Sequence, residues 1–251
     1  MTVLFVLSLA LLGFVMKLAA MFSGCERRGP CPGLKFVLSP LLAPNSLSRC
    51  QPLTETFAAL RRGVLFIACF LAAHLVCRQV VSALDLRGPI VSYLAMPTVL
   101  FLGDALVPLA TLAWLPAGYV LPLVHDNPIV ARSLAEFWGR RWNFWFSDWF
   151  RWVIFDRMRS RPVMAILIVF AVSGLMHEAI INLTLVILTG HNLIGSMMIY
   201  FLVQGIGVLI EHRFLKAKAT ARRIFLWSVV VGPVPLIINE GLLRALWLWP
   251  G

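Results

Sequence analysis

Long apolar stretches recur along the whole 251-residue chain, and they constrain its fold more than any other feature. Each is long enough to cross roughly 30 Å of hydrocarbon as an α-helix, which satisfies its own backbone hydrogen bonds where lipid cannot. The stretches lie at about residues 2–22, 63–84, 89–115, 162–189, 193–211 and 224–249. The sequence therefore predicts an all-α fold: a polytopic transmembrane bundle of about six spans, forming one domain over residues 1–251.

The composition agrees, because 60% hydrophobic and 13% charged residues lie outside the range of a soluble globular domain. The first stretch ends in small residues around Ala19 and Ala20, as a secretory signal does. It lacks a basic leading segment, and its apolar run is too long for a signal. We expect it to be a retained transmembrane helix.

The net charge is +11, but the basic residues lie mainly in the gaps between the apolar stretches, so they do not indicate a nucleic-acid surface. Alternate gaps between the spans hold 19 of the 22 Lys and Arg, and the opposite side holds 3. The positive-inside rule places the richer gaps in the cytoplasm. We therefore expect a multi-pass membrane protein with both termini on the outer side.

Two of the gaps are not simple loops. Residues 24–51 are rich in proline but carry apolar residues between the prolines, which fits a short interfacial piece. Residues 127–161 contain nine Phe and Trp between Phe137 and Trp152, with arginines among them. Amphipathic rings mixed with arginine are typical of the headgroup level, so this segment is predicted to form interfacial aromatic-rich helices on the membrane.

Ionisable residues inside a membrane span are costly, and each is a functional hypothesis. His177 and Glu178 lie near the middle of the 162–189 stretch. Adjacent helical residues point about 100° apart, so Glu178 is not expected to orient His177 directly; two ionisable groups on two faces favour a polar cavity. Asp104 is a second intramembrane acid, and an ion pair between helices is as good an interpretation of it as a role in catalysis.

The sequence lacks the motifs that are typical of metal sites and of hydrolases. His177 has Ile181 at the position where a zincin needs its second histidine, and the other histidines are scattered. There is no Gly-x-Ser-x-Gly elbow or phosphate-binding Gly-Lys loop. The five cysteines are assigned no site. We expect no metal and no cofactor, only acid–base chemistry by one histidine, whose ordinary pKa of about 6.5 suits proton transfer near neutral pH.

Two strings carry a family resemblance. Phe137-Trp-Gly-Arg-Arg-Trp-Asn143 is followed 34 residues later by His177 in the string Ser173-Gly-Leu-Met-His-Glu178. In this order they resemble the wax synthase branch of the membrane-bound O-acyltransferases, over a core motif region of residues 130–215. The resemblance implies a helical membrane enzyme, acyl-CoA as donor and co-substrate, and a hydroxyl-bearing lipid as acceptor. At 251 residues the chain is short for this family, which puts the acceptor in doubt more than the reaction.

The resemblance also implies site residues. Asn143 matches the family asparagine and His177 the family histidine, and both are expected to be catalytic, with His177 as general base. Six other residues of the two strings are expected to contact substrate: Trp138, Arg140, Arg141, Trp142, Ser173 and Glu178. We expect acyl-CoA to enter from the cytoplasmic side, where the arginines lie. For any single arginine, the simpler interpretation is that it sets the membrane topology and contacts lipid headgroups.

The leading hypothesis is an acyl-CoA:alcohol O-acyltransferase that makes wax esters from long-chain fatty alcohols. In one alternative the reaction is the same, but the acceptor that receives the acyl or acetyl group is diacylglycerol, a sterol, a glycan or a small molecule. From another class, the chain could be a proton-coupled transporter in which His177, Glu178 and Asp104 relay protons. A degenerate family member that only binds is the third alternative, which the intact Asn143 and His177 disfavour.

Overall fold

The structure is a computed structural model that describes residues 2–25, 41–44, 50–52, 56–114, 119–215 and 218–249. It confirms the all-α prediction. Within these ranges, the β-structure is one antiparallel pair of two-residue strands, β1 (Gln51–Pro52) and β2 (Tyr119–Val120). In the described part of the chain, six helical segments are long and apolar enough to cross a membrane: Thr2–Ser23, Phe57–Ala83, Pro89–Leu112, Pro162–Thr189, Ser196–Phe214 and Ala219–Ile237.

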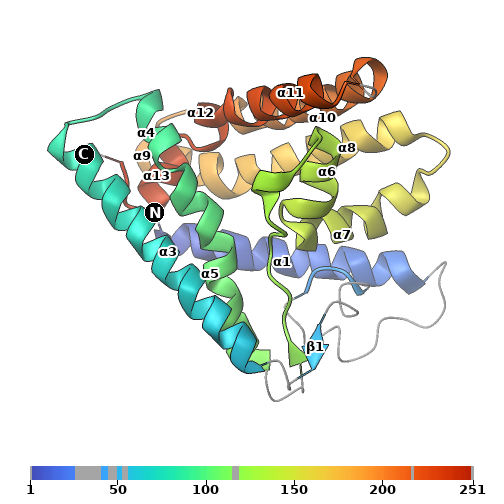
Figure 1. Cartoon of the computed structure of the whole chain (residues 1–251), viewed down its shortest axis with the longest axis horizontal. Coiled ribbons are helices and arrows are strands. Elements are labelled where there is room, and N and C mark those ends of the chain that lie inside the picture. Colours follow the sequence, from blue (N-terminus) through green and yellow to red (C-terminus); the bar gives the residue numbers. More distant parts are fainter. Residues whose placement is uncertain are drawn as a thin grey trace.

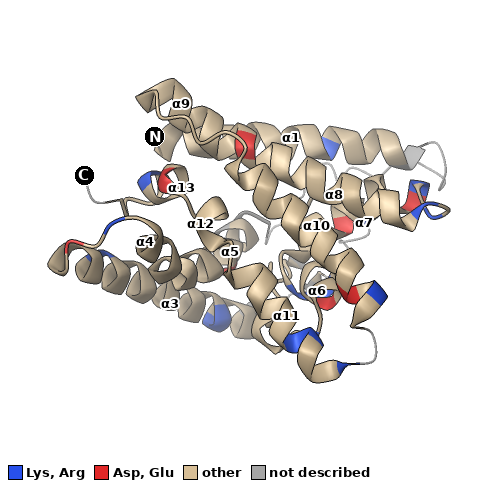
Figure 2. Ribbon diagram, turned by 90° about the horizontal axis from the view of Figure 1, so that it is seen from above, with Lys and Arg blue, Asp and Glu red and all other residues tan. Residues whose placement is uncertain are grey.

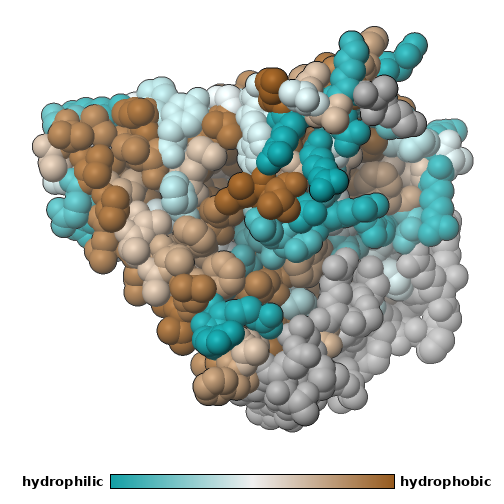
Figure 3. All heavy atoms as spheres, in the orientation of Figure 1, coloured by the Kyte–Doolittle hydropathy of each residue, from teal (hydrophilic) through white to brown (hydrophobic). Residues whose placement is uncertain are grey.

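The spans fall into two groups (Figure 1). Helices α1 (Thr2–Cys25), α8 (Pro162–His177), α10 (Ser196–Phe214) and α11 (Ala219–Val231) run across the view, while α3 (Thr56–Ala83) and α5 (Met96–Trp114) form a diagonal pair. Gly63 of α3 lies against the Pro108 ring of α5, where no larger side chain fits. Apolar side chains cover much of the face over α3 and α5, and hydrophilic ones gather near α6 and α11 (Figure 3).

The last predicted span is wrong in its bounds. It starts at Ala219 rather than 224 and ends at Ile237 rather than 249. Pro233 separates α11 from α12 (Val234–Ile237), because proline has no N–H to continue a helix. Asn239 then caps α13 (Glu240–Ala245) by accepting hydrogen bonds from the Gly241 and Leu242 amides. The third span is likewise two helices, α4 (Pro89–Leu94) followed by α5.

Helices α8 and α10 pack closely because small residues lie between them. A Cβ on Gly174 would lie 2.9 Å from the Met198 Sδ, and one on Gly205 would lie 3.0 Å from the Phe170 ring. A five-residue π-helix, η7 (Glu178–Asn182), follows α8 and continues into α9 (Leu183–Thr189). His177 is therefore the last residue of α8 before a change in helical pitch, on the helix that packs against α10.

The aromatic segment forms short helices outside the six spans: η4 (Pro128–Val130), α6 (Leu134–Glu136), the π-helix η5 (Phe137–Arg141), α7 (Phe144–Val153) and η6 (Phe155–Arg157). Several of its rings point into the protein. The Trp149 and Trp152 indoles donate to the Met16 and Ala20 carbonyls of α1, at 2.7 and 3.0 Å. The interfacial piece expected within 24–51 lies mostly outside the described residues.

Candidate active site

A cavity of about 570 Å³ lies between α7 and α8. Helices α7 and α8 run in opposite directions and are joined through η6 (Figure 1). Each contributes residues at helical spacing, so each presents one face to the cavity. From α7 and the residue before it these are Asn143, Phe146, Ser147, Phe150 and Arg151; from α8 they are Pro162, Ile166, Val169, Phe170, Ser173 and His177.

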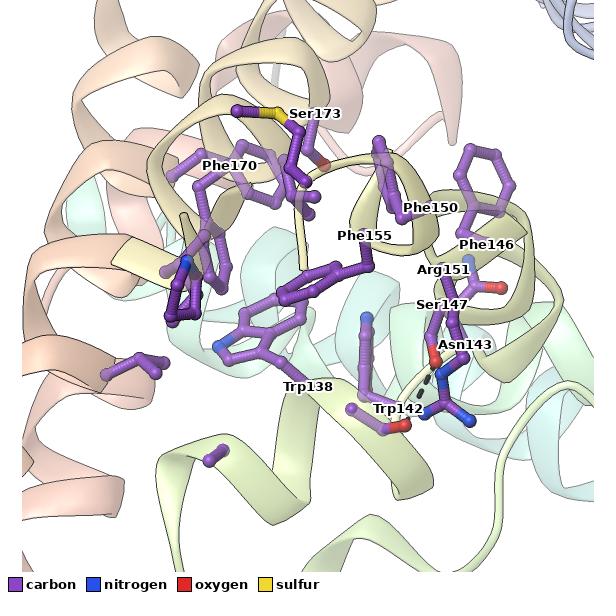
Figure 4. A pocket seen from close by; sticks show the side chains of 18 of the residues that line it. Trp138, Trp142, Asn143, Phe146, Ser147, Phe150, Arg151, Phe155, Phe170 and Ser173 are labelled. Atoms are coloured by element: carbon purple, nitrogen blue, oxygen red, sulfur yellow. Dashed lines mark hydrogen bonds between the residues drawn. The ribbon is translucent and has the colours of Figure 1, made fainter. Parts of the chain in front are cut away.

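Aromatic rings enclose the middle of this cavity. Trp138, Trp142, Phe155 and Phe201 complete its walls (Figure 4). The Trp138 indole is held by a hydrogen bond to Gln204 Oε1 of α10, at 3.2 Å. The lining is thus mainly apolar, with Asn143, Ser147, Ser173 and His177 among the few groups able to exchange hydrogen bonds with a ligand. Such a lining suits an apolar chain that carries one reactive polar group.

The hydrogen bonding of His177 defines which ring nitrogen is a base. Its Nδ1 lies 2.7 Å from the Ser173 carbonyl oxygen, one turn earlier on α8. A carbonyl only accepts, so Nδ1 carries the proton and donates it. In the neutral ring this leaves the Nε2 lone pair free to accept a proton. The ring also packs against Phe201, with centroids 4.5 Å apart, which fixes its plane.

Asn143 reaches the same cavity through an unusual backbone conformation. Its φ is 42° and its ψ is 62°, the left-handed region, which asparagine tolerates better than most residues. It is the residue before α7, and its carbonyl accepts from the Phe146 and Ser147 amides. This turn ends the π-helix η5 and redirects the chain into α7, so the Asn143 side chain lines the cavity (Figure 4).

The buried carboxylate of Asp104 binds a loop that flanks Asn143. Asp104 of α5 accepts from the Val124 and His125 amides at 2.7 and 3.1 Å, and its other oxygen lies 3.1 Å from His125 Nδ1. The Val124 carbonyl in turn accepts from the Phe144 amide, and the Asp126 amide donates to the Arg141 carbonyl. Residues 124–126 are therefore bonded to the backbone on both sides of Asn143. His125 also packs on Trp142, with ring centroids 4.5 Å apart.

The structure brings together some of the predicted site residues and not others. His177, Asn143, Trp138, Trp142 and Ser173 all line the cavity, whereas Arg140, Arg141 and Glu178 do not. Arg141 pairs with Glu136, Nε to Oε1 at 2.6 Å, and Arg140 is exposed. The cavity arginines are instead Arg151 and Arg159, and Arg159 pairs with Asp156 at 2.7 Å.

Glu178 lies in a separate buried polar cluster. One of its oxygens accepts from the Gly195 and Met198 amides at the start of α10, and the other accepts from Asn182 Nδ2 at 2.7 Å. Asn239 joins the cluster through Asn182 Oδ1, at 2.8 Å. A carboxylate at a helix N-terminus satisfies amides that lipid would leave unpaired. The cavity therefore contains His177 without Glu178, and its lining is mainly apolar rather than polar as predicted.

Sequence reasoning missed Phe201, Arg159 and the pairing of Asp104 with His125. The helical spacing of 162, 166, 169, 173 and 177 was a usable signal, because it predicts that these residues share one face of α8. Nothing local to Asp104 identifies His125, which is 21 residues away.

Residues 121–204, which contain both Asn143 and His177, match the Membrane bound O-acyl transferase family. The match covers about a third of the chain. It comprises the loop bound by Asp104, the aromatic segment and the spans through the middle of α10, and it includes most of the cavity lining. The resemblance inferred from the two strings is confirmed.

Two plant proteins are similar to part of this chain. A long-chain-alcohol O-fatty-acyltransferase of Simmondsia chinensis is 39% identical over 82 residues, which are 28% of this chain and 22% of that protein. A probable long-chain-alcohol O-fatty-acyltransferase 9 of Arabidopsis thaliana is 37% identical over 83 residues, 29% of this chain and 24% of that protein. The similarity spans less than a quarter of either relative's length.

Proposed function

We propose that this protein is an acyl-CoA-dependent O-acyltransferase that esterifies a long-chain fatty alcohol, with His177 as general base and Asn143 as a hydrogen-bond donor. The observation that carries the proposal is that both residues line one largely apolar cavity. They lie 34 residues apart in the sequence, Asn143 just before α7 and His177 at the end of α8. The similarity to two long-chain-alcohol acyltransferases supports the choice of acceptor.

The chemistry follows from the free Nε2 of His177. As the alcohol oxygen attacks the thioester carbonyl carbon, Nε2 takes the hydroxyl proton. The Asn143 amide donates to the oxyanion of the tetrahedral intermediate. Collapse of the intermediate breaks the carbon–sulfur bond, and the CoA sulfur leaves with the proton from His177. The products are one ester and free CoA, and no covalent acyl-enzyme is needed.

The residues along the cavity also indicate how acyl-CoA would be oriented in it. Arg151, Met158 and Arg159 line the end near the turn between α7 and α8, and His177 lies about fifteen residues along α8 from that turn. The phosphates of acyl-CoA would meet Arg151 at that end, since guanidinium groups bind phosphate well. The thioester would then lie deeper, between Asn143 and His177. Entry from the cytoplasm is part of this proposal.

The proton-coupled transporter receives less support. Such a relay needs carboxylates that exchange protons with His177. Both oxygens of Glu178 are engaged by amides around the α9–α10 turn, and both oxygens of Asp104 are engaged by residues 124 and 125. Neither carboxylate lines the cavity.

A direct assay tests the proposal. The purified protein is given radiolabelled palmitoyl-CoA with hexadecanol or with diacylglycerol, and both ester and free CoA are measured. We expect ester with hexadecanol, and a loss of at least roughly 10²-fold in His177→Gln, the usual size of a lost general base. His212→Gln, an exposed histidine at the end of α10, is the matched control. Equal rates in His177→Gln and wild type would refute the mechanism, and ester from diacylglycerol alone would refute the acceptor.

A further inference from the structure

A second groove, separate from the cavity, lies along α11. It encloses about 1070 Å³, and its lining shares no residue with the cavity lining. Three arginines contribute to it: Arg132, which precedes α6, and Arg222 and Arg223 from the first turn and a half of α11. Among the described residues that line it, none is acidic. Its positive end is therefore complementary to an anion.

The rest of the groove is a stripe on one face of α11. Thr220, Arg223, Ile224, Trp227, Ser228 and Val231 line it, at helical spacings of three and four. Along this stripe the residues change from basic to mainly apolar, and Ile224 is 65% exposed. The groove therefore accepts a molecule with a charged head and an apolar tail lying parallel to the helix.

The length of the stripe matches one leaflet of a membrane. From Thr220 to Val231 the helix rises about 16 Å, at 1.5 Å per residue. Half of a hydrocarbon core roughly 30 Å thick is about 15 Å. The arginines lie where α10 ends and α11 begins, an end of the molecule where charged residues gather (Figure 2). A headgroup bound there would leave its acyl chain beside Ile224, Trp227 and Val231.

We propose that this groove is a binding site for an anionic phospholipid, with the phosphate on Arg132, Arg222 and Arg223 and one acyl chain along α11. Of the three arginines, Arg222 is held in place by Glu211, whose Oε1 lies 3.9 Å from the Arg222 Nε. Glu211 in turn accepts hydrogen bonds from the Leu134 and Ala135 amides. Those contacts tie the groove to α6, which begins the aromatic segment. The site does not depend on acyl transfer.

Native mass spectrometry of the full chain in detergent tests the site, with palmitoyl-oleoyl phosphatidylglycerol and phosphatidylcholine as probes. We expect one retained phosphatidylglycerol at concentrations where phosphatidylcholine does not bind. Arg132→Gln with Arg223→Gln should weaken that binding about 30-fold, which corresponds to roughly 1 kcal/mol for each arginine. Arg213→Gln with Lys218→Gln is the matched control, because it removes the same charge at the same end, outside the groove.

Four outcomes would overturn the proposal: equal binding of the two lipids, an equal loss in the control variant, displacement by inorganic phosphate, or displacement by equimolar palmitoyl-CoA. A second measurement locates the lipid even where a charge variant binds poorly. Trp227 is the one tryptophan among the described residues that line the groove. Brominated phosphatidylglycerol should quench wild-type fluorescence more than brominated phosphatidylcholine does. That difference should disappear in Trp227→Phe and persist in Trp247→Phe, which is 70% exposed outside the groove; its persistence in Trp227→Phe would refute the site.

Discussion

At Asn143 the backbone and the side chain favour the same residue type for different reasons. The left-handed conformation, with φ at 42°, suits asparagine or glycine and costs most other residues about 1 kcal/mol or more. The side-chain amide faces the cavity that also contains His177. An alanine substitution would therefore change both strain and chemistry, and its effect alone would not separate them.

Asn143→Gly separates the two. Glycine keeps the left-handed turn without strain and removes only the amide. If the amide stabilises the oxyanion, we expect kcat to fall roughly 10²- to 10³-fold in Asn143→Gly while the thermal midpoint stays near wild type. Asn143→Ala should lose as much activity and also melt at a lower temperature. Wild-type kcat in Asn143→Gly would assign the residue a structural role alone.

Glu136 provides a test of the aromatic segment by pH. Burial alone would raise the pKa of its carboxyl, but hydrogen bonds from the Arg132 amide and the Arg141 guanidinium outweigh it and hold the pKa below the usual value. Its stabilising effect is therefore complete above the ordinary glutamate pKa of about 4.3 and is lost as pH falls through the lower folded value. The thermal midpoint of wild type minus that of Glu136→Gln should be constant from pH 7 to about 5 and shrink below. A difference that grows on acidification would contradict this sign.

At the scale of elements, the segment around Asn143 is held by a loop whose residues 124 and 125 are not among the residues described as lining the cavity. Asp104 fixes residues 124 and 125, and that loop brackets Asn143 through the Val124–Phe144 and Arg141–Asp126 backbone hydrogen bonds. We therefore expect Asp104 to act as a positioning residue. Charge-assisted hydrogen bonds to buried carboxylates are worth more than neutral ones, so this contact between α5 and the aromatic segment is costly to remove.

A double-mutant cycle tests whether Asp104 acts through Asn143. Asp104→Asn alone should lower kcat with little change in KM for acyl-CoA. In the Asn143→Gly background the same substitution should have almost no further effect on kcat, because coupled residues are not additive. Glu211→Gln is the matched control: this buried carboxylate also accepts two backbone amides, those of residues 134 and 135, which do not flank Asn143. Its effect should add to that of Asn143→Gly, and full additivity for Asp104→Asn would refute the positioning role.

Across the whole molecule, the beginning of α1 and the end of α13 meet at one end. The Thr2 hydroxyl donates to the carbonyl of Ala245, the last residue of α13, at 3.0 Å. The turn after α9 and the turn before α4 lie toward the same end in Figure 1, opposite the turn between α7 and α8. This arrangement is the one that an even number of spans requires.

The orientation in the membrane follows from charge. Because 19 of the 22 basic residues lie in alternate gaps, we predict that the α10–α11 connection is cytoplasmic and the α9–α10 turn is external. Single reporters, His191→Cys and Lys218→Cys, are placed in a cysteine-free background in intact cells. A membrane-impermeant maleimide should label position 191 and reach position 218 only after permeabilisation. The reverse pattern would invert the topology and the proposed side of acyl-CoA entry.

The sequence by itself determined the spans and a family resemblance. Twenty apolar residues in lipid have few alternatives to a helix, and the two strings around Asn143 and His177 lie in the stretch that the family model matches. What occupies each side of a helix was decided by the tertiary structure. The pairing of Asp104 with His125, the cap that Glu178 forms on α10 and the inward indoles of Trp149 and Trp152 all join residues 17 to 133 positions apart. Hydropathy reports how apolar a segment is, but a buried polar group takes its partner from whichever distant segment packs beside it.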